Sequence, residues 1–438
     1  MEIELLIIPE WIITVNPENQ VLRHHALAVN NSRIVGILPA SEAEKHYRPR
    51  KIVALPQHAL LPGLVNAHTH AAMALLKGLA DDLPLMDWLQ NHIWPAEARW
   101  ADAEFVHDGT QLAIAEMLRS GTTCFNDMYF FPEATAQAVD EAGIRACIGL
   151  IVIDFPTAWG SGPEEYLQKG LALHDQLLEK PLLTTALAPH APYTVSDEPL
   201  KQLLHLACEM DIPVHMHVHE TAFEVQQAQE QNGARPLERL NQLGLLDKHF
   251  LAVHMTQLSE DEIALLAQKG THVIHCPESN LKLASGFCPA AQLLTAGVNV
   301  ALGTDGNASN NDLDMLGEIR TAALIAKAVA QDASVVPAMQ ALRMATINAA
   351  KALGLEQEIG SLEVGKAADM IAINLGTLES QPLYDPVSHL VYCTSRDQVT
   401  HVWVAGRMLL ENRSLTTLDE TALIAKARQW RKKIGETP

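Results

Sequence analysis

Apolar runs of strand length alternate with amphipathic stretches from Leu60 to Gly306, and this rhythm leaves few folds open to the chain. The runs are LLPGLVNAH, TTCFNDM, RACIGLIVI, LLTTALAPH, IPVHMHVHE, FLAVHM, THVIHCP and VNVALGTDG. Stretches with helical spacing, such as VHDGTQLAIAEMLRS, stand between them. Repeated strand–helix units predict a parallel sheet, and about eight of them predict a closed (β/α)8 barrel of the TIM type.

The two ends of the chain have a different pattern. The first 57 residues contain short apolar runs separated by turns, such as LLIIPEWIITV and KIVALP. The same pattern returns after Gly360 in GSLEVGKAADMIAINL and VTHVWVAGRMLLENR. Such runs are typical of short antiparallel strands. We therefore predict a composite β-sandwich domain from residues 1–57 and 360–438, with a helix over 418–433, and a barrel domain over 58–359 inserted between its halves.

Composition limits the partners and the compartment. Of the 438 residues, 48% are hydrophobic and 19% are charged, which allows a large core. Against 31 basic side chains stand 52 acidic ones, and the net charge of −21 disfavours nucleic acid or an anionic membrane as a partner. We find no membrane-spanning run, no signal-peptide pattern and no C-x-x-C pair among the six cysteines. These features predict a cytoplasmic protein with reduced thiols.

Polar side chains stand at the ends of four of the predicted strands. In a strand, residues two apart point to the same side, so a His-x-His pair can bind one ion. A parallel barrel gathers the carboxyl ends of its strands at one face, where catalytic groups collect. The four clusters are His68 with His70, the run His215–Met216–His217–Val218–His219–Glu220, His254, and Asp305. Together they predict a metal centre at that face.

These residues resemble the amidohydrolase superfamily of metal-dependent barrel hydrolases, and the resemblance extends from PGLVNAHTH to GSLEVGKAADMI. It implies that the metal ligands are His68, His70, His217 and Asp305. Family members with two metals use a carboxylated lysine on the fourth strand, where this chain has LLTTALA. One divalent ion per subunit is therefore expected. Three imidazoles and one carboxylate suit Zn²⁺ best, although Fe²⁺ accepts the same donors.

Glu220 follows His217 by three residues and resembles the H-x-x-E arrangement of the adenosine and cytosine deaminase branch. Deamination needs hydroxide at neutral pH, which a metal supplies by lowering the pKa of its bound water to about 7. It also needs a group that carries a proton to the ring nitrogen and then to the departing amine. We expect Glu220 to carry that proton and Asp305 to take the proton of the metal water. His254 would orient this water or the developing alkoxide.

Longer motifs resemble the 5′-methylthioadenosine/S-adenosylhomocysteine deaminase family. They are DLPLMDWL and IWPAE after the first barrel strand, then APHAPY, SNLKLASG and GTDGNASNND. The resemblance implies that Glu97 accepts hydrogen bonds from the two ribose hydroxyls, that His190 touches the sugar or the base, and that Trp88 forms a flat wall for adenine. Glu220 and Asp305 would also contact the substrate.

The resemblance implies hydrolysis of 5′-methylthioadenosine, S-adenosylhomocysteine or adenosine to the inosine derivative and ammonia, by attack of a metal-bound hydroxide on C6. The expected partner is thus a small adenosine-derived nucleoside, and barrels with such an accessory module are often dimers or tetramers. Relatives that favour S-adenosylhomocysteine can bring arginines from the segment after the third strand, which here reads IVIDFPTAWG. Its apolar Phe155 and Trp159 suit a methylthio group better, so we expect 5′-methylthioadenosine to be preferred.

Two other functions remain open from the sequence. A related barrel hydrolase, such as an s-triazine chlorohydrolase or a guanine-type deaminase, would use the same metal water on a different ring. A non-catalytic metal-binding scaffold is more distant, because a structural zinc needs neither Glu220 nor His254. The run GSLEVGK imitates a phosphate-binding loop, but Ala367 replaces the Ser or Thr that binds Mg²⁺, and a strand-like run follows.

Overall fold

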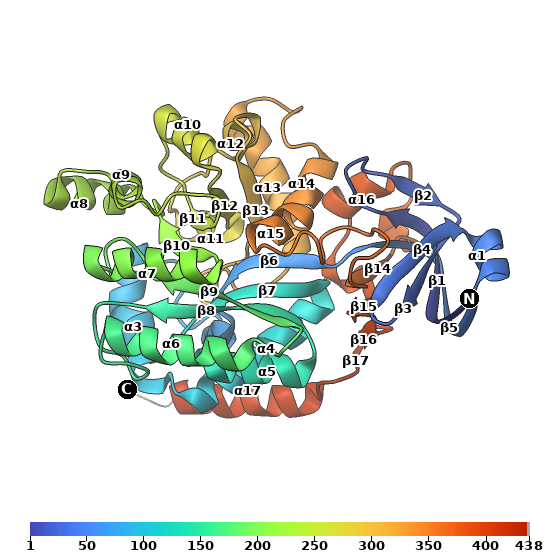
Figure 1. Ribbon diagram of the computed structural model, residues 1–438, viewed down its shortest axis with the longest axis horizontal. Coiled ribbons are helices and arrows are strands. Elements are labelled where there is room, and N and C mark those ends of the chain that lie inside the picture. The colour runs from blue at the N-terminus through green and yellow to red at the C-terminus, as the bar shows by residue number, and fades with distance from the viewer. Residues whose placement is uncertain (436–438) are drawn as a thin grey trace.

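Eight parallel strands follow one another around a barrel in the order of the sequence (Figure 1). The computed structural model describes residues 1–435. The barrel strands are β6 (Leu64–Thr69), β7 (Thr122–Met128), β8 (Arg145–Val152), β9 (Leu183–Pro189), β10 (Val214–Val218), β11 (Phe250–His254), β12 (His272–His275) and β13 (Asn299–Leu302). Strand β5 (Arg48–Pro62) leads directly into β6. The predicted barrel is therefore confirmed.

Closure of the barrel depends on the segment that follows β13. The backbone N–H of Asp305 donates to the carbonyl of His68 at 3.0 Å, and the N–H of Thr304 donates to Asn66 Oδ1 at 3.0 Å. Gly303 permits this approach, because a Cβ there would lie only 2.8 Å from the Cβ of His68. Asp305 is thus held against the first barrel strand.

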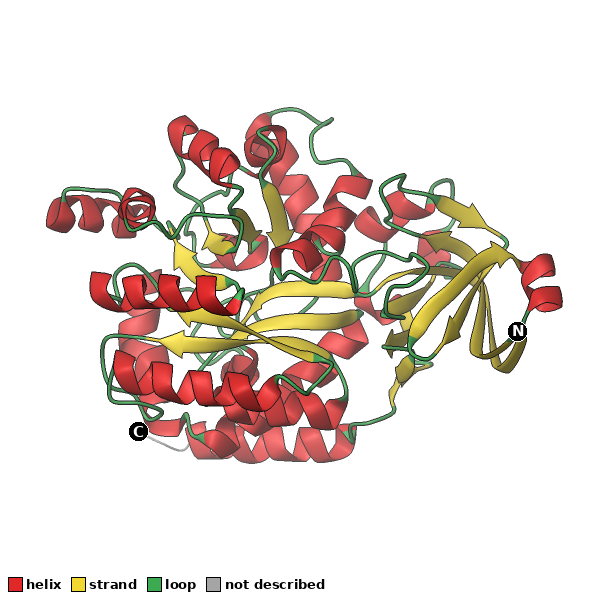
Figure 2. Ribbon diagram, in the orientation of Figure 1, coloured by secondary structure: helices red, strands yellow, loops and turns green. Residues whose placement is uncertain are grey.

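Helices surround the barrel (Figure 2), and some of them begin at a residue whose side chain caps the helix. Asp102 accepts a hydrogen bond from the N–H of Phe105, and Ser259 forms a capping box with Glu262. The surrounding helices are α4 (Ala103–Ser120), α5 (Pro132–Ala142), α6 (Pro163–Leu177), α7 (Asp197–Met210), α8 (Ala222–Asn232), α9 (Pro236–Gln242), α10 (Glu260–Lys269), α12 (Ala290–Thr295), α13 (Met315–Ala330), α14 (Ala338–Met344) and α15 (Ile347–Ala352). Among the described residues, no helix is long and apolar enough to cross a bilayer.

The second sheet combines both ends of the chain, because β14 pairs antiparallel with β5. The prediction of antiparallel strands misses one feature: β1 and β5 are parallel, and three strands and helix α1 (Ala40–His46) intervene before β5 returns beside β1. Leu27 of β3 and Met370 of β14 share one apolar cluster, so the bent sheet encloses its own core. Its other strands are β1 (Glu2–Ile13), β2 (Val21–Arg23), β3 (His25–Asn30), β4 (Arg33–Pro39), β14 (Met370–Asn374), β15 (Val399–Val404), β16 (Arg407–Glu411) and β17 (Ser414–Leu415).

The predicted C-terminal helix is α17, which begins at Glu420 and ends at Gly435. It packs against the barrel helix α4, where Trp430 Nε1 donates to Asp108 Oδ2 at 3.0 Å. A shorter helix, α16 (Pro386–Tyr392), lies between β14 and β15. The division into domains at 57/58 and 359/360 stays a prediction.

Residues 77–100, which we call the cap segment, connect the first barrel strand to the first surrounding helix. After β6 come a 3₁₀ helix, η1 (Ala71–Leu76), then α2 (Leu85–Trp88), a π-helical turn η2 (Leu89–Ile93) and α3 (Trp94–Trp100). The last three elements are consecutive and form one helical run. Its apolar side chains pack into a cluster that includes Trp88 and Ile93.

Candidate active site

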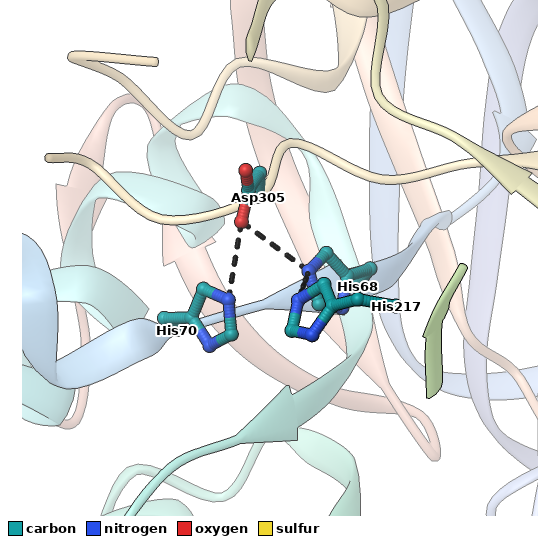
Figure 3. Close-up of side chains that lie close together, drawn as sticks. All are labelled: His68, His70, His217 and Asp305. Atoms are coloured by element: carbon teal, nitrogen blue, oxygen red, sulfur yellow. Dashed lines mark hydrogen bonds and ion pairs between the residues drawn. The ribbon is translucent and has the colours of Figure 1, made fainter. Parts of the chain in front are cut away.

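Four side chains meet at the carboxyl ends of the barrel strands, two from strands β6 and β10 and two from the loops that follow β6 and β13 (Figure 3). They are His68, His70, His217 and Asp305, and their ligand atoms all lie within 4.8 Å of one another. Asp305 Oδ1 lies 3.2 Å from Nε2 of both His68 and His70. His217 Nε2 lies 3.2 Å from His68 Nε2. The structure thus brings together all four residues that the sequence predicts as metal ligands.

The other ring nitrogen of each histidine has its own partner. His70 Nδ1 donates to the carbonyl of Met128 at 2.6 Å, and His217 Nδ1 donates to the carbonyl of His190 at 2.8 Å. His68 Nδ1 is in hydrogen-bond contact with His215 Nε2 at 2.9 Å. Such contacts orient histidine ligands and, when the ring is neutral, leave the lone pair of Nε2 free for an ion.

Asp305 is fixed by its backbone and by two hydroxyls. Its φ of 63° is uncommon for a residue other than glycine and turns the carboxylate toward the histidines. The Oδ2 atom accepts hydrogen bonds from Ser279 Oγ at 2.6 Å and Ser309 Oγ at 2.9 Å. Burial raises the pKa of Asp305, but the hydrogen bonds and charges of His68 and His70 outweigh it and hold the pKa well below its usual value.

The donor set fits a single divalent ion. Three imidazole nitrogens and one carboxylate oxygen are the donors that Zn²⁺ prefers, and Fe²⁺ accepts them too. Burial lowers the pKa of His68 to about 4 and holds that of His217 well below its usual value, so both rings are neutral at pH 7. Burial also acts to lower the pKa of His70, but the hydrogen bond and charge of Asp305 outweigh it and raise this pKa to about 9, so an ion would displace the proton of that ring. Neutral imidazole is the form that binds metal.

Glu220 and His254 lie beside this group but are not part of it. His254 Nε2 is 3.9 Å from Glu220 Oε2, and Ser285 Oγ lies 3.4 Å from Glu220 Oε1. Burial raises the pKa of Glu220, so it keeps a proton at a higher pH than an exposed glutamate. His254 Nδ1 donates to Asn280 Oδ1 at 2.9 Å, which leaves its Nε2 as a hydrogen-bond acceptor.

A cavity of about 480 Å³ opens above the metal ligands. His70, His217 and Asp305 line it, while His68 lies beneath them and is fully buried. The other predicted site residues, namely Trp88, Glu97, His190, Glu220 and His254, also line it. The predicted ligands and the predicted substrate contacts therefore share one cavity, and their individual roles stay predictions.

Glu97 and His190 stand in different surroundings on the cavity wall. Burial raises the pKa of Glu97 to about 7, although nearby Tyr129 and His70 act to lower it. Burial lowers the pKa of His190 to about 3, so this ring is neutral. Its Nδ1 donates to the hydroxyl of Thr194 at 3.0 Å, which leaves Nε2 as an acceptor.

Trp159 is not a cavity residue, which corrects the expectation that it faces the substrate. Its ring stacks on Tyr166 with centroids 5.6 Å apart, and its Nε1 donates to Glu133 at 3.1 Å. Both contacts hold the indole in the core of the protein. Phe155, Pro156 and Thr157 of the same segment do line the cavity, and Phe155 is 45% exposed.

Sequence reasoning missed several residues of the site. Tyr129 directly follows strand β7, so the rule that selected the other strand ends also points to it. Ser279 and Asn280 lie four and five residues after β12, inside helix α11 (Pro277–Lys282), and that rule does not select them. The same is true of Trp94 and Ser309, because neither of them directly follows a strand. In all, the site residues that the sequence did not predict are Tyr129, Ser279, Asn280, Ser309 and Trp94.

Comparisons with known proteins agree with this geometry. The model of the amidohydrolase family matches residues 59–409. A 5-methylthioadenosine/S-adenosylhomocysteine deaminase from Teredinibacter turnerae is 53% identical over 97% of this chain and 96% of its own length. The crystal structure of an adenosine deaminase from Xanthomonas campestris with bound zinc has a TM-score of 0.98 and 54% identity, over 100% of this chain and 99% of that one.

A more remote structure shares the fold alone. Atrazine chlorohydrolase from Arthrobacter aurescens, complexed with zinc, is 23% identical with a TM-score of 0.90, over 97% of this chain and 99% of that one.

Proposed function

Because the chain belongs to the amidohydrolase family and, within it, to the 5-methylthioadenosine/S-adenosylhomocysteine deaminases, we propose that it hydrolyses the adenine amine of these nucleosides. The products are the inosine derivative and ammonia. The observation that carries the proposal is that Glu220 and the four metal-binding side chains line or underlie the same cavity as Glu97.

The residues around the reacting atoms divide the proton transfers among them. His68, His70, His217 and Asp305 would hold a divalent ion, which would supply a nucleophilic water at neutral pH because coordination lowers the pKa of water to about 7. Asp305 would take up one proton of this water. Glu220 would give its proton to the ring nitrogen, receive the proton from Asp305, pass it to the departing amine, and regain a proton from the new hydroxyl group. His254 Nε2 would accept a hydrogen bond from the water and so orient it.

The cavity wall holds the rest of the nucleoside. Glu97 accepts hydrogen bonds from the ribose diol, His190 Nε2 accepts one from the sugar or the base, and the indole of Trp88 covers the adenine. The same Glu97 favours a ribose-bearing substrate over the guanine or s-triazine ring of the alternative hydrolases. A non-catalytic scaffold would need neither Glu220 nor this cavity.

We favour 5′-methylthioadenosine over S-adenosylhomocysteine. Among residues 1–435, those that line the cavity include no lysine or arginine to pair with an amino-acid carboxylate. Phe155 and Pro156 offer an apolar surface to a methylthio group instead. Phe155→Arg is therefore expected to raise the turnover of S-adenosylhomocysteine relative to 5′-methylthioadenosine. An unchanged ratio would contradict this preference.

The experiment that tests the function follows the loss of adenine absorbance with zinc-loaded protein. The substrates are 5′-methylthioadenosine, S-adenosylhomocysteine, adenosine and AMP, and a chelator-treated sample is the control. We expect fast conversion of a 5′-thio-substituted nucleoside and slow conversion of AMP, whose phosphate finds no cation on the described cavity wall. No conversion of any of the four would overturn the proposal and return attention to guanine and triazines.

Two coarser expectations accompany this function. The described chain has no helix that could span a membrane, and a cytoplasmic location stays a proposal. We also propose a homo-oligomer, either a dimer or a tetramer. Light scattering of the purified protein would test the latter, and a monomer at micromolar concentration would exclude it.

A further inference from the structure

We propose that Lys282 is a positioning residue for substrate binding: together with Asp81 and Asn311 it fastens the cap segment over the cavity. The inference rests on the proposed function, because it treats this cavity as the nucleoside site. Lys282 ends helix α11 (Pro277–Lys282), which follows barrel strand β12. Asp81 belongs to the cap segment, and Asn311 to the loop after β13.

The three side chains form a closed set of contacts. Lys282 Nζ donates to Asp81 Oδ1 at 2.6 Å and to Asn311 Oδ1, and it lies 3.4 Å from the carbonyl of Ala308. Asn311 Nδ2 lies 3.4 Å from both carboxylate oxygens of Asp81. The hydrogen bond from Lys282 lowers the pKa of Asp81 and keeps it ionised. Three segments far apart in the sequence are thus joined by one ammonium group.

The joined segment carries much of the cavity wall. Leu85, Trp88, Leu89, Trp94 and Glu97 all line the cavity, and all lie on the helical run that begins four residues after Asp81.

We call the contacts among Lys282, Asp81 and Asn311 the clasp. Apolar contacts of neighbouring residues join the cap segment to the same two loops. Leu283, next to Lys282, and Ala308, three residues before Asn311, share an apolar cluster with Trp88. The far end of the cap segment is anchored separately, where Trp100 meets Trp430 with ring centroids 6.5 Å apart. Lys282 therefore acts at the near end, where Lys77 Nζ also donates to Glu116 Oε2 at 2.7 Å.

Helix α11 and the residues after it also support the reacting groups. Ser279 donates to Asp305 Oδ2, Asn280 accepts from His254, and Ser285 lies beside Glu220. Lys282 stands between these residues in the sequence. The cap segment and the acid–base groups therefore share one support, which aligns the ribose-binding wall with the reacting centre.

This arrangement predicts that the clasp affects binding rather than chemistry. Lys282 touches none of the proposed reacting groups, so its loss should loosen the wall that carries Trp88 and Glu97 without removing a proton carrier. The Lys282 and Asp81 side chains are 22% and 37% exposed, so salt should weaken their attraction.

The test compares Lys282→Met, Lys282→Arg, Asp81→Asn and the Lys282→Met/Asp81→Asn double variant with the wild type. Lys180→Met is the matched control, because Lys180 forms an ion pair with Asp140 away from the cap segment. For Lys282→Met we expect KM for 5′-methylthioadenosine to rise about fivefold, with kcat within about twofold and zinc content unchanged. The KM of the double variant should be no higher than that of the single variant with the higher KM. Lys282→Arg should have a KM between those of Lys282→Met and the wild type.

Two further readouts separate the clasp from general stability and from the proposed function. Raising the salt concentration should increase KM of the wild type but not of Lys282→Met. Amide hydrogen exchange over residues 77–100 should accelerate in Lys282→Met and not in Lys180→Met. Because exchange needs no turnover, it tests the clasp even if no nucleoside is deaminated. Unchanged exchange and unchanged KM, or a fall in kcat at constant KM, would overturn the proposal.

Discussion

Glu220 is the side chain whose replacement tests the proposed chemistry most directly. Glu220→Gln keeps the size and polarity of the buried group but cannot pass a proton between the ring nitrogen and the amine. We expect turnover of 5′-methylthioadenosine to fall at least about a hundredfold, the scale of general acid–base catalysis. Zinc content should stay unchanged, because Glu220 is not among the ligand atoms. Metal analysis and initial rates on the same preparation check both statements.

His68→Ala is the contrasting variant, since it should lose zinc and activity together. Full zinc occupancy in His68→Ala would contradict the ligand assignment, whereas near-normal turnover in Glu220→Gln would remove Glu220 from the mechanism.

The raised pKa of Glu97 should make substrate affinity depend on pH. Burial raises its pKa to about 7, so the carboxyl group is protonated below that pH and ionised above it. A carboxylate can accept hydrogen bonds from both ribose hydroxyls, whereas the protonated acid must use one oxygen as a donor. KM for 5′-methylthioadenosine should therefore fall as the pH rises through about 7. Glu97→Gln should have a higher KM that no longer changes over this range, and an identical pH profile in both proteins would refute the assignment.

Strand geometry alone points to the clusters that contain the metal-binding side chains, whereas the family resemblance singles out His217 within its run and gives Glu220 its expected role. His68 and His70 lie two residues apart at a strand end, and a parallel barrel turns every such end to one face. The hydrogen bonds that orient the rings are a different matter. They come from the carbonyls of Met128 and His190, which any residue would supply, so no side chain in the sequence marks them.

At the scale of whole elements, the cap segment shows where sequence patterns fail. Helical spacing continued from Leu85 and Trp88 would bring positions 92 and 96 to the cavity. The π-helical turn Leu89–Ile93 shifts that face, so Trp94 and Glu97 line the cavity instead. A π turn is set by tertiary contacts and is often found at functional sites. The family resemblance pointed to Glu97, whereas periodicity alone does not.

The packing of helix α17 should contribute to the stability of the protein, although this helix lies far from the reacting atoms. Trp430 is 4% exposed, packs edge-on against Phe105 with centroids 5.3 Å apart, and donates to Asp108. Trp430→Ala should lower the free energy of unfolding by about 3–5 kcal/mol, because it leaves a cavity between α17 and α4. Trp430→Phe keeps most of the packing and should cost about 1–3 kcal/mol for the buried Asp108 oxygen that loses its donor. Urea unfolding measures whether Trp430→Ala is less stable than Trp430→Phe. A decrease of less than about 1 kcal/mol in the free energy of unfolding of Trp430→Ala would contradict the prediction.

At the scale of the whole molecule, one buried ion pair links the barrel to the sheet formed by the chain ends. Arg145 begins strand β8, and Asp369 directly precedes β14. Arg145 Nε and Nη2 donate to the two carboxylate oxygens of Asp369 at 2.8 and 3.2 Å. Asp369 Oδ1 also accepts from the backbone N–H of Ala405 at 2.7 Å. The side chains are 7% and 1% exposed, so neither charge has water as an alternative partner.

Removing one member of this pair should therefore cost more than removing both. Arg145→Met alone leaves the buried carboxylate of Asp369 without its ion-pair partner, and Asp369→Asn alone does the same to the guanidinium of Arg145. Each single variant should lower the free energy of unfolding by about 3–5 kcal/mol. The Arg145→Met/Asp369→Asn double variant leaves no unpaired charge, so its loss should be well below the sum of the single losses. Lys180→Met, which breaks an exposed pair, should stay within about 0.5 kcal/mol of the wild type. Urea unfolding of the zinc-loaded proteins measures all of these, and single variants as stable as Lys180→Met would show that Arg145 and Asp369 do not hold the two sheets together.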